Sequence, residues 1–372
     1  PFYQYYLTGQ KSALPVGILP IDTDRIAPFS GSILVTTLLD GLHLVEPKDD
    51  RPQAIGHHRY ATDFLGDGEN SPVRAIHRTP SGTIYVATYH EPDDEGPRDV
   101  IVRIDSAERP PSIEEIEPLE LRDVVTDLDI PWEILWGYDN TIWMTERGGR
   151  VSRVDPVSGE TAHLLTIPSV EEVENTGLLG MALHPNFCDT PSVYLVYTWR
   201  AEDGQLFERL VAYNYEVTAD TLVDEEVLLD SVPVSGSHAG SRVVIGTDRM
   251  LYMTVSDADR QNDVQDYTKQ PGKIFRLHLD GSVPASNPYA GADRPTSLIW
   301  SIGHRNPQGL VMTDDGRLYS SEHGPSTDDE VNRIERDANY GWPDVSGYCD
   351  TPYEVRFCDE EGVTEPMFAW TP

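Results

Sequence analysis

Hydrophobic positions along this chain occur in short runs that are bounded by turn residues. The runs are rich in Val, Ile, Leu and aromatic residues, and Gly, Asp, Asn and Pro separate them. β-Strands show this pattern, because branched and aromatic side chains suit a pleated surface whereas Gly, Asn and Asp favour turns. No long segment has the periodicity of an amphipathic helix. We therefore expect an all-β protein.

One unit recurs along the chain: a turn with Gly, Asp or Asn, followed by an apolar strand centred on an aromatic residue. The copies lie at residues 80–86, 138–143, 247–252 and 314–319, with weaker copies at 32–35 and 192–195. Their spacing of roughly fifty to seventy residues is the period of a propeller blade. Six such units fit a six-bladed β-propeller of four-stranded antiparallel blades. A pair of β-sandwiches is the alternative, and the repeat count favours the propeller.

We see no interdomain linker and expect a single domain over residues 1–372. The formal net charge is −35, and lysine occurs only at positions 11, 48, 269 and 273. A nucleic-acid partner or an anionic membrane surface is disfavoured, because both require a basic face. The acid excess is typical of a solvated surface, and it could also steer a basic electron-carrier protein. No apolar run is long enough to span a bilayer, and no signal peptide is visible at Pro1.

The three cysteines divide into a pair and a single residue. Cys349 and Cys358 flank a short acidic loop, residues 350–357. A disulfide there would close the loop and would indicate an oxidising compartment, so we expect a periplasmic, secreted or cell-surface protein. Cys188 is expected to be a lone, partly buried thiol.

Residues 303–348 hold the densest concentration of polar chemistry in the chain. Cations, acids, amides, Gly and Pro alternate there, and such residues gain little in a core because buried charges must be paired. Arg305 and Asn306 suggest a site for an anionic ligand, and the acids at 328–330 suggest a hard cation such as calcium, which binds oxygen ligands. An arginine that bridges blades and a solvated acidic turn are the alternatives.

His238 lies in a stretch rich in Gly and Ser, residues 235–242, just before an expected strand. A neutral imidazole can accept a proton from a substrate hydroxyl near pH 7. The alternative is a turn histidine that bonds to backbone. Asn175 begins a polar loop at 175–180 that is mostly structural on its own. The chain has no serine nucleophile elbow, phosphate-binding glycine loop or zinc-hydrolase helix.

Together these residues resemble the soluble PQQ-dependent glucose and sorbosone (aldose sugar) dehydrogenases. The resemblance covers residues 126–372, and its motifs are residues 131–132, 143–147, 177–180, 184–185, 238–246, 272–274, 279–282 and 303–348. Residues 1–125 resemble the C-terminal blades of that family, and 126–372 resemble its N-terminal blades. We therefore expect a circular permutation, which a propeller tolerates because its ends meet at the surface. A truncated C-terminus with unrelated N-terminal blades is the alternative.

The resemblance implies oxidation of an aldose at its anomeric carbon, with hydride passed to the quinone. It implies PQQ and Ca²⁺ as cofactors, a small-molecule sugar as substrate and an electron-acceptor protein as a possible partner. His238 would be the general base, and Arg305 would polarise the quinone. The cofactor contacts would come from Arg74, Asn175, Arg305 and Asn306.

The same resemblance implies two calcium sites. The carbonyls of Gly324 and Pro325 would hold a calcium ion that bridges to PQQ. A second, structural calcium would lie among several residues, of which the tyrosines and the serine would give backbone oxygens: Glu330, Tyr340, Ser346, Tyr348 and Asp350.

Four positions depart from the family pattern. Ser237 stands where the family carries an acid before its histidine, so we expect His238 to be a weaker base. Asn175 replaces a glutamine. Leu39 and Pro72 replace cations near the cofactor carboxylates, and each lost charge pair should cost about 1–3 kcal/mol of PQQ affinity.

Two further functions are compatible with this fold. A non-catalytic, calcium-stabilised propeller would act as an extracellular binding or scaffold module, and the altered positions Leu39 and Pro72 favour it. A lactonase-type hydrolase would need calcium deep in the central channel, held by side chains rather than by the carbonyls of Gly324 and Pro325.

Overall fold

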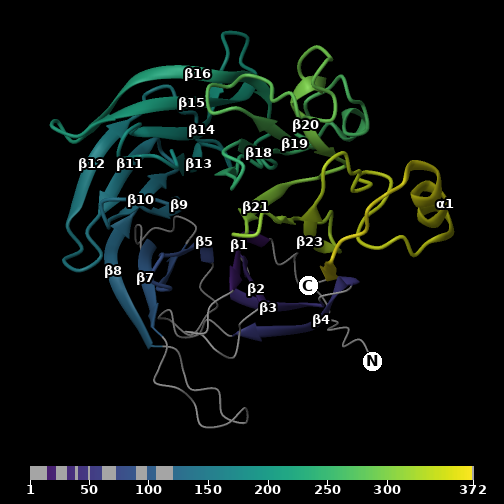
Figure 1. Cartoon of the computed structure of the whole chain (residues 1–372), viewed down its shortest axis with the longest axis horizontal. Helices are drawn as coiled ribbons and strands as arrows, with labels where there is room; N and C mark the ends of the chain where they lie inside the picture. Colours follow the sequence, from purple (N-terminus) through teal and green to yellow (C-terminus); the bar gives the residue numbers. More distant parts are fainter. Residues whose placement is uncertain are drawn as a thin grey trace.

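The computed structural model describes residues 15–21, 32–37, 41–48, 51–60, 73–88, 99–105 and 120–370. Strands β1 to β24 form six four-stranded sheets, each built from four strands that are consecutive in the chain. Neighbouring strands pair antiparallel throughout, as in the register Tyr252↔Arg276. Figure 1 shows the sheets arranged around a common axis. The prediction of an all-β propeller with four-stranded antiparallel blades is confirmed.

The strand bounds follow the chain sheet by sheet. The first two sheets are β1 (Pro15–Ile21), β2 (Ser32–Thr37), β3 (Gly41–Lys48) and β4 (Arg51–Tyr60), then β5 (Val73–Arg78), β6 (Ile84–Thr88), β7 (Asp99–Asp105) and β8 (Glu120–Leu128). The next two are β9 (Pro131–Trp136), β10 (Ile142–Glu146), β11 (Arg150–Val154) and β12 (Thr161–Thr166), then β13 (Leu178–Leu183), β14 (Ser192–Arg200), β15 (Leu206–Glu216) and β16 (Thr221–Pro233). The last two are β17 (Val243–Ile245), β18 (Leu251–Val255), β19 (Lys273–Leu277) and β20 (Ile299–Ile302), then β21 (Pro307–Met312), β22 (Leu318–Glu322), β23 (Asp329–Ile334) and β24 (Phe368–Trp370).

The recurring sequence unit marks the same strand of each sheet in which it occurs. Its four clear copies lead into β6, β10, β18 and β22, and the weaker copies lie in β2 and β14. Each of these is the second strand of its sheet. The turn residues of the unit therefore form the connection from the first strand to the second.

The core lies between neighbouring sheets. One cluster joins Trp143 and Val151 of the third sheet to Met181, Leu195 and Tyr213 of the fourth, and all five are buried. Burying a large apolar side chain stabilises the fold by about 1.5–3 kcal/mol. This packing fixes the first strands of the sheets side by side, and β1, β5, β9, β13, β17 and β21 contact one another in a closed series. The loops that precede β13, β17 and β21 then meet at one mouth of the central channel.

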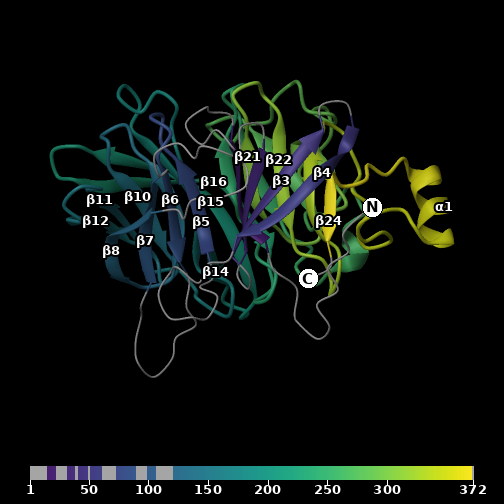
Figure 2. The same cartoon turned by 90° about the horizontal axis from the view of Figure 1, so that it is seen from below.

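One α-helix occurs in the described residues, where we expected an acidic loop. Helix α1 (Pro352–Glu361) starts at a capping box between Thr351 and Glu354 and ends at Gly362, whose φ is +67°. Its start signals, Thr followed by Pro and then by Glu, are local and short, and none of its residues is buried. Figure 2 shows α1 at one side of the molecule, away from the sheets.

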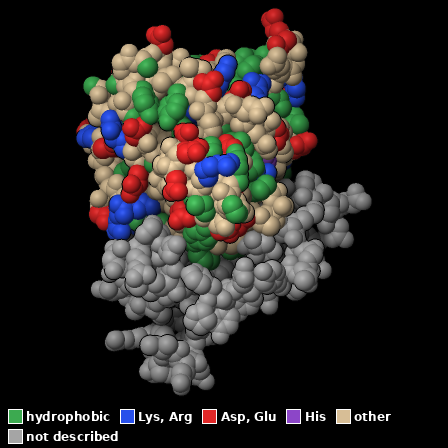
Figure 3. Space-filling view, turned by 90° about the vertical axis from the view of Figure 1, so that its right-hand side faces the viewer, with side chains coloured by type: hydrophobic (Ala, Val, Ile, Leu, Met, Phe, Trp, Pro, Cys, Tyr) green, Lys and Arg blue, Asp and Glu red, His purple; other side chains and the backbone are tan. Residues whose placement is uncertain are grey.

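The expected Cys349–Cys358 disulfide is present and joins α1 to the loop before it. Cys188 is exposed, so the prediction of a partly buried thiol is wrong. It lies in the turn between β13 and β14 rather than in a strand. Acidic side chains are spread over the face that carries α1 (Figure 3). The helices in the described ranges are all too short or too polar to span a membrane.

Candidate active site

The loop before β17 presents His238. The Ser235 hydroxyl accepts a hydrogen bond from the His238 backbone N–H at 3.0 Å, and the Ser256 hydroxyl donates to the His238 carbonyl at 2.7 Å. Gly240 has φ +62°, and a Cβ there would lie 2.9 Å from the Ser256 nitrogen. Only glycine fits this close approach of loop and strand end. The loop therefore holds the imidazole at a fixed place.

His238 is paired with a buried acid that the sequence analysis missed. Asp257 follows β18 and is fully buried, and its Oδ1 lies 2.7 Å from His238 Nδ1. A neutral imidazole that donates from Nδ1 to a carboxylate keeps Nε2 as its proton acceptor. Nε2 has no hydrogen-bond partner among the described residues. Although Ser237 replaces the acid that precedes the family's histidine, β18 brings Asp257 to the imidazole; the expectation that His238 is a weaker base stays a prediction.

A second acid, Asp259, lies at the same side of the ring. Its Oδ1 is 3.5 Å from His238 Nδ1, and its Oδ2 accepts from the Ser237 hydroxyl at 2.9 Å. Partial burial raises the pKa of Asp259, but hydrogen bonds from Ser235 and Ser237 outweigh it and hold the pKa below the ordinary value. Asp259 is thus ionised near the imidazole, and because its side chain is 56% exposed, solvent screens its charge.

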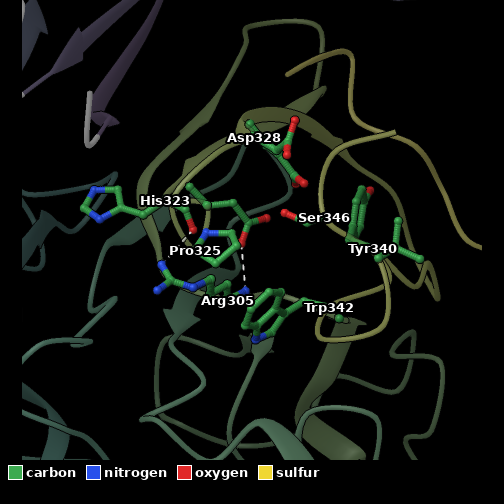
Figure 4. A pocket seen from close by; sticks show the side chains of 12 residues that line it. Arg305, His323, Pro325, Asp328, Tyr340, Trp342 and Ser346 are labelled. Carbon is green, nitrogen blue, oxygen red and sulfur yellow. Dashed lines mark hydrogen bonds between the residues drawn. The ribbon is translucent and has the colours of Figure 1, made fainter. Parts of the chain in front are cut away.

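Arg305 lies in the loop before β21, next to this pair. Its backbone N–H donates to Glu322 Oε2 at 3.0 Å, and its Nη1 donates to the His323 carbonyl at 3.1 Å (Figure 4). The guanidinium lies 5.4 Å from the centroid of the Trp342 ring. Burial lowers the pKa of Arg305, and nearby acids, first Asp257, oppose that shift. Nε is buried and has no hydrogen-bond partner in the described chain.

The other expected cofactor residues fall into two groups. Asn306 is buried, and its Oδ1 accepts from the Gly240 N–H at 3.1 Å, which ties the Arg305 loop to the His238 loop. Asn175 donates from its backbone to the Gly236 carbonyl at 2.9 Å, so it too borders the His238 loop. Arg74 is buried on β5, where Nη1 donates to Gln308 Oε1 at 3.1 Å. Leu39 and Pro72 lie outside the described residues.

Asn175, His238, Arg305 and Asn306 are therefore brought together, although 130 positions separate the first from Arg305 (305 − 175). They come from the loops that precede three first strands, β13, β17 and β21. The Asp257 backbone N–H donates to the Arg305 carbonyl at 2.7 Å and completes the contact between the loops.

Residues 324–350, which we call the calcium segment, line a small cavity together with Gly303, Arg305, Glu322 and His323. Its volume is about 10 Å³, close to what one water-sized particle requires. Five of the seven expected calcium ligands line it, together with Asp328: Gly324, Pro325, Glu330, Tyr340 and Ser346. Figure 4 shows Asp328, Tyr340 and Ser346 around it. Tyr348 and Asp350 do not line the cavity.

The donor atoms of this segment suit a hard cation. Burial raises the pKa of Glu330 well above its usual value, and the charge of Glu322 adds to the shift. A bound cation would offset both effects. The Tyr340 hydroxyl already donates to the Arg333 carbonyl at 2.5 Å, which leaves its backbone oxygen as the available ligand.

Backbone carbonyls supply the remaining oxygens. No N–H group in the described ranges donates to the carbonyls of the five expected backbone ligands, which are Gly324, Pro325, Tyr340, Ser346 and Tyr348. Gly324 and Tyr340 are buried, and buried carbonyl groups are normally paired, so their unpaired carbonyls beside the Glu330 carboxylate fit the oxygen-rich shell of calcium.

Comparison with known proteins gives these features a context. A model of the family described as "Glucose / Sorbosone dehydrogenase" matches residues 128–372. Quinoprotein glucose dehydrogenase B of Acinetobacter calcoaceticus is 38% identical over 261 residues, which cover 63% of this chain and 54% of the relative. Aldose sugar dehydrogenase YliI of Escherichia coli is 30% identical over 254 residues, covering 65% of this chain and 68% of the relative. The chain thus matches only about half of the first relative's length.

Solved structures agree with the sequence comparisons. The PQQ-bound aldose sugar dehydrogenase of Streptomyces coelicolor has a TM-score of 0.60 and 30% identity, over 67% of this chain and 70% of that one. The apo form of the soluble aldose sugar dehydrogenase from Escherichia coli has a TM-score of 0.58 and 28% identity, over 66% of this chain and 73% of that one. The family match covers well over half of the residues and includes the loops that carry His238, Asp257 and Arg305. The chain belongs to the glucose/sorbosone dehydrogenase family.

Proposed function

We propose that this chain is a sugar dehydrogenase that oxidises an aldose at its anomeric carbon. The observation that carries the proposal is the His238–Asp257 pair, 2.7 Å apart, which the Asp257 backbone N–H joins to the Arg305 carbonyl at 2.7 Å. Nε2 accepts the proton of the anomeric hydroxyl, and the buried carboxylate of Asp257 stabilises the imidazolium that forms. His238 takes only the proton, so the hydride of the anomeric carbon requires a separate acceptor.

PQQ, when bound, supplies that acceptor. Arg305 is the residue best suited to hold it, because its buried Nε has no partner within the described chain and its positive charge complements a quinone oxygen or a carboxylate. Asn175 and Arg74 are proposed as further contacts. Asn306 has its Oδ1 engaged by Gly240, so we assign it the task of holding the two loops in register.

Calcium is proposed as the second cofactor. The unpaired carbonyls of Gly324 and Pro325 would hold the ion that faces PQQ. The structural ion would take Glu330 and the backbone oxygens of Tyr340 and Ser346, with Tyr348 and Asp350 completing its shell. Asp328 is added as a candidate ligand, because its carboxyl group lines the same cavity.

We further propose that the six sheets are the blades of one closed ring and that residues 1–372 form one domain. Contact between β1 and β21 supports this, because it joins the first sheet of the chain to the last. On this arrangement residues 1–125 occupy the places of the family's last blades, as a circular permutation requires. A protein opened between Leu128 and Asp129, after β8, with its present ends joined, should then fold into the same propeller.

The setting of the reaction is also a proposal. The Cys349–Cys358 disulfide favours an oxidising compartment, so we propose a periplasmic, secreted or cell-surface location. Two electrons leave each sugar, so an electron acceptor is required, and the net charge of −35 would suit a basic acceptor protein.

Reconstitution tests the function directly. The protein is titrated with PQQ and Ca²⁺, and aldose-dependent reduction of a dye is measured. His238→Ala should abolish the activity, whereas His163→Ala should not, because His163 is exposed on β12 and its side chain bonds to the Thr166 hydroxyl alone among the described residues. Wild-type activity no higher than that of His238→Ala would overturn the proposal.

A further inference from the structure

A single tryptophan joins the catalytic pair to the calcium segment. The indole Nε1 of Trp342 donates to Asp257 Oδ2 at 2.9 Å. The other oxygen of the same carboxylate lies 2.7 Å from His238 Nδ1. A neutral donor stabilises the negative charge of a buried carboxylate and fixes its rotation, while it leaves the other oxygen for the imidazole. The orientation of the base therefore depends on where the indole lies.

The same ring contacts the other catalytic side chain. The Arg305 guanidinium lies 5.4 Å from the Trp342 ring centroid, within the range of a cation–π contact. Figure 4 shows the indole beside Arg305 at the edge of the cavity. Trp342 thus contacts Asp257 and Arg305, two of the three side chains that we assign to the reaction.

The backbone of Trp342 is fixed to the two catalytic loops. Its N–H donates to the Gly303 carbonyl at 3.1 Å, two residues before Arg305. Its carbonyl accepts from Gln265 Nε2 at 2.7 Å, and Gln265 belongs to the loop that begins at Asp257. Trp342 also lines the cavity formed by the calcium segment. A shift of the cavity wall is therefore passed to the indole.

We propose that Trp342 is a positioning residue through which calcium binding aligns His238. With the ion bound, the calcium segment holds Nε1 at the Asp257 carboxylate, and that carboxylate holds the imidazole with Nε2 towards the substrate. Without the ion, the segment loosens and the hydrogen bond to Asp257 is lost. The catalytic part of this inference rests on the proposed function, while the structural coupling does not.

The first test compares two tryptophans. Trp342→Phe keeps an aromatic ring against Arg305 but removes the N–H group. Trp300→Phe is the matched control, because Trp300 also packs on an arginine, Arg276 at 4.9 Å, and its Nε1 has no partner among the described residues. We expect Trp342→Phe to lower kcat about tenfold with KM within about twofold, the effect of losing one hydrogen bond to a charged group. Trp300→Phe should leave both constants unchanged.

The second test needs neither cofactor nor sugar. Ca²⁺ is titrated into the PQQ-free protein, and tryptophan emission is recorded for the wild type, Trp342→Phe and Trp300→Phe. The difference between the wild type and Trp342→Phe isolates Trp342, and it should change saturably with Ca²⁺. The change should persist in Trp300→Phe and vanish in Glu330→Ala.

The outcomes separate the two proposals. The coupling is overturned if Trp342→Phe keeps the kcat of the wild type. It is also overturned if Ca²⁺ raises the melting temperature but leaves the emission of Trp342 unchanged. If the wild type oxidises no aldose, the proposed function fails, and the emission titration alone decides whether calcium binding moves Trp342.

Discussion

Replacing Asp257 by Asn tests the catalytic pair with the smallest change of shape. The carboxylate is fully buried, and both of its oxygens accept hydrogen bonds. Oδ1 accepts from His238 Nδ1 at 2.7 Å and from the Asp259 N–H at 3.0 Å, and Oδ2 accepts from Trp342 Nε1 at 2.9 Å. An amide has only one acceptor oxygen. Asp257→Asn must therefore place an N–H group against either the imidazole or the indole.

The size of the effect follows from these contacts. A hydrogen bond to a charged group contributes about 1.5–3 kcal/mol, which corresponds to roughly 10- to 150-fold in rate. If the amide turns its N–H group to His238, Nδ1 must become the acceptor and Nε2 carries the proton, so the base is lost as well. We expect kcat/KM to fall at least 100-fold at pH 7, with a change of only a few degrees in melting temperature.

The assay is dye reduction by the reconstituted protein over a range of aldose concentrations, with circular dichroism to confirm the fold. Asp259→Asn is the matched control, because that acid also lies near His238 but its side chain is 56% exposed. Its effect should stay within about threefold, as expected for a screened charge. The reasoning is refuted if Asp257→Asn keeps activity within threefold of the wild type, or if Asp259→Asn has the larger effect.

Three further predictions concern stability. Burial raises the pKa of Glu208 well above its usual value, so above about pH 4.5 the folded state binds a proton that the unfolded state has lost, and stability should fall as the pH rises from there towards the pKa of the folded state. Glu208→Gln should therefore stabilise the protein by about 1–3 kcal/mol at pH 7 and not at pH 3, as measured by urea unfolding, and an equal gain at both pH values would contradict this. Chelation of calcium should lower the melting temperature of the wild type to that of Glu330→Ala and leave the variant unchanged in a calorimeter. Gly240→Ala should cost about 1–3 kcal/mol, because its Cβ would lie 2.9 Å from the Ser256 nitrogen, and a neutral result in urea would show that the loop can move.

The sequence predicts the sheets well because the relevant signals are local. The turn unit before each second strand, as at 247–252, needs only a few adjacent residues, and it locates strand β18 (Leu251–Val255) correctly. Helix α1 was missed because its ten residues bury no side chain and so carry no periodic apolar face. Its capping residues Thr351 and Glu354 were the available signal.

The site was predicted less completely, since its contacts cross between loops. His238 and Arg305 stood out by residue type, but Asp257 did not, because an acid at the end of a strand usually faces water. Its role depends on β18, which returns the chain to the mouth of the channel after a separation of 19 residues from His238. Trp342 was visible in its motif, yet only the folded chain shows its Nε1 bonded to Asp257.

The retention of this network bears on whether catalysis survives in a chain that has Leu39 and Pro72 in place of expected cations. A scaffold that had lost its chemistry would have no need to bury an acid at 0% exposure against a histidine, because an unpaired or poorly placed buried carboxylate costs several kcal/mol. Here both oxygens of Asp257 are fully engaged, and Nε2 of His238 is left free among the described residues. The retained pair therefore supports the proposed role of His238 as a proton acceptor. The loss of cations at Leu39 and Pro72 would lower the affinity for PQQ, but it would not alter the His238–Asp257 pair.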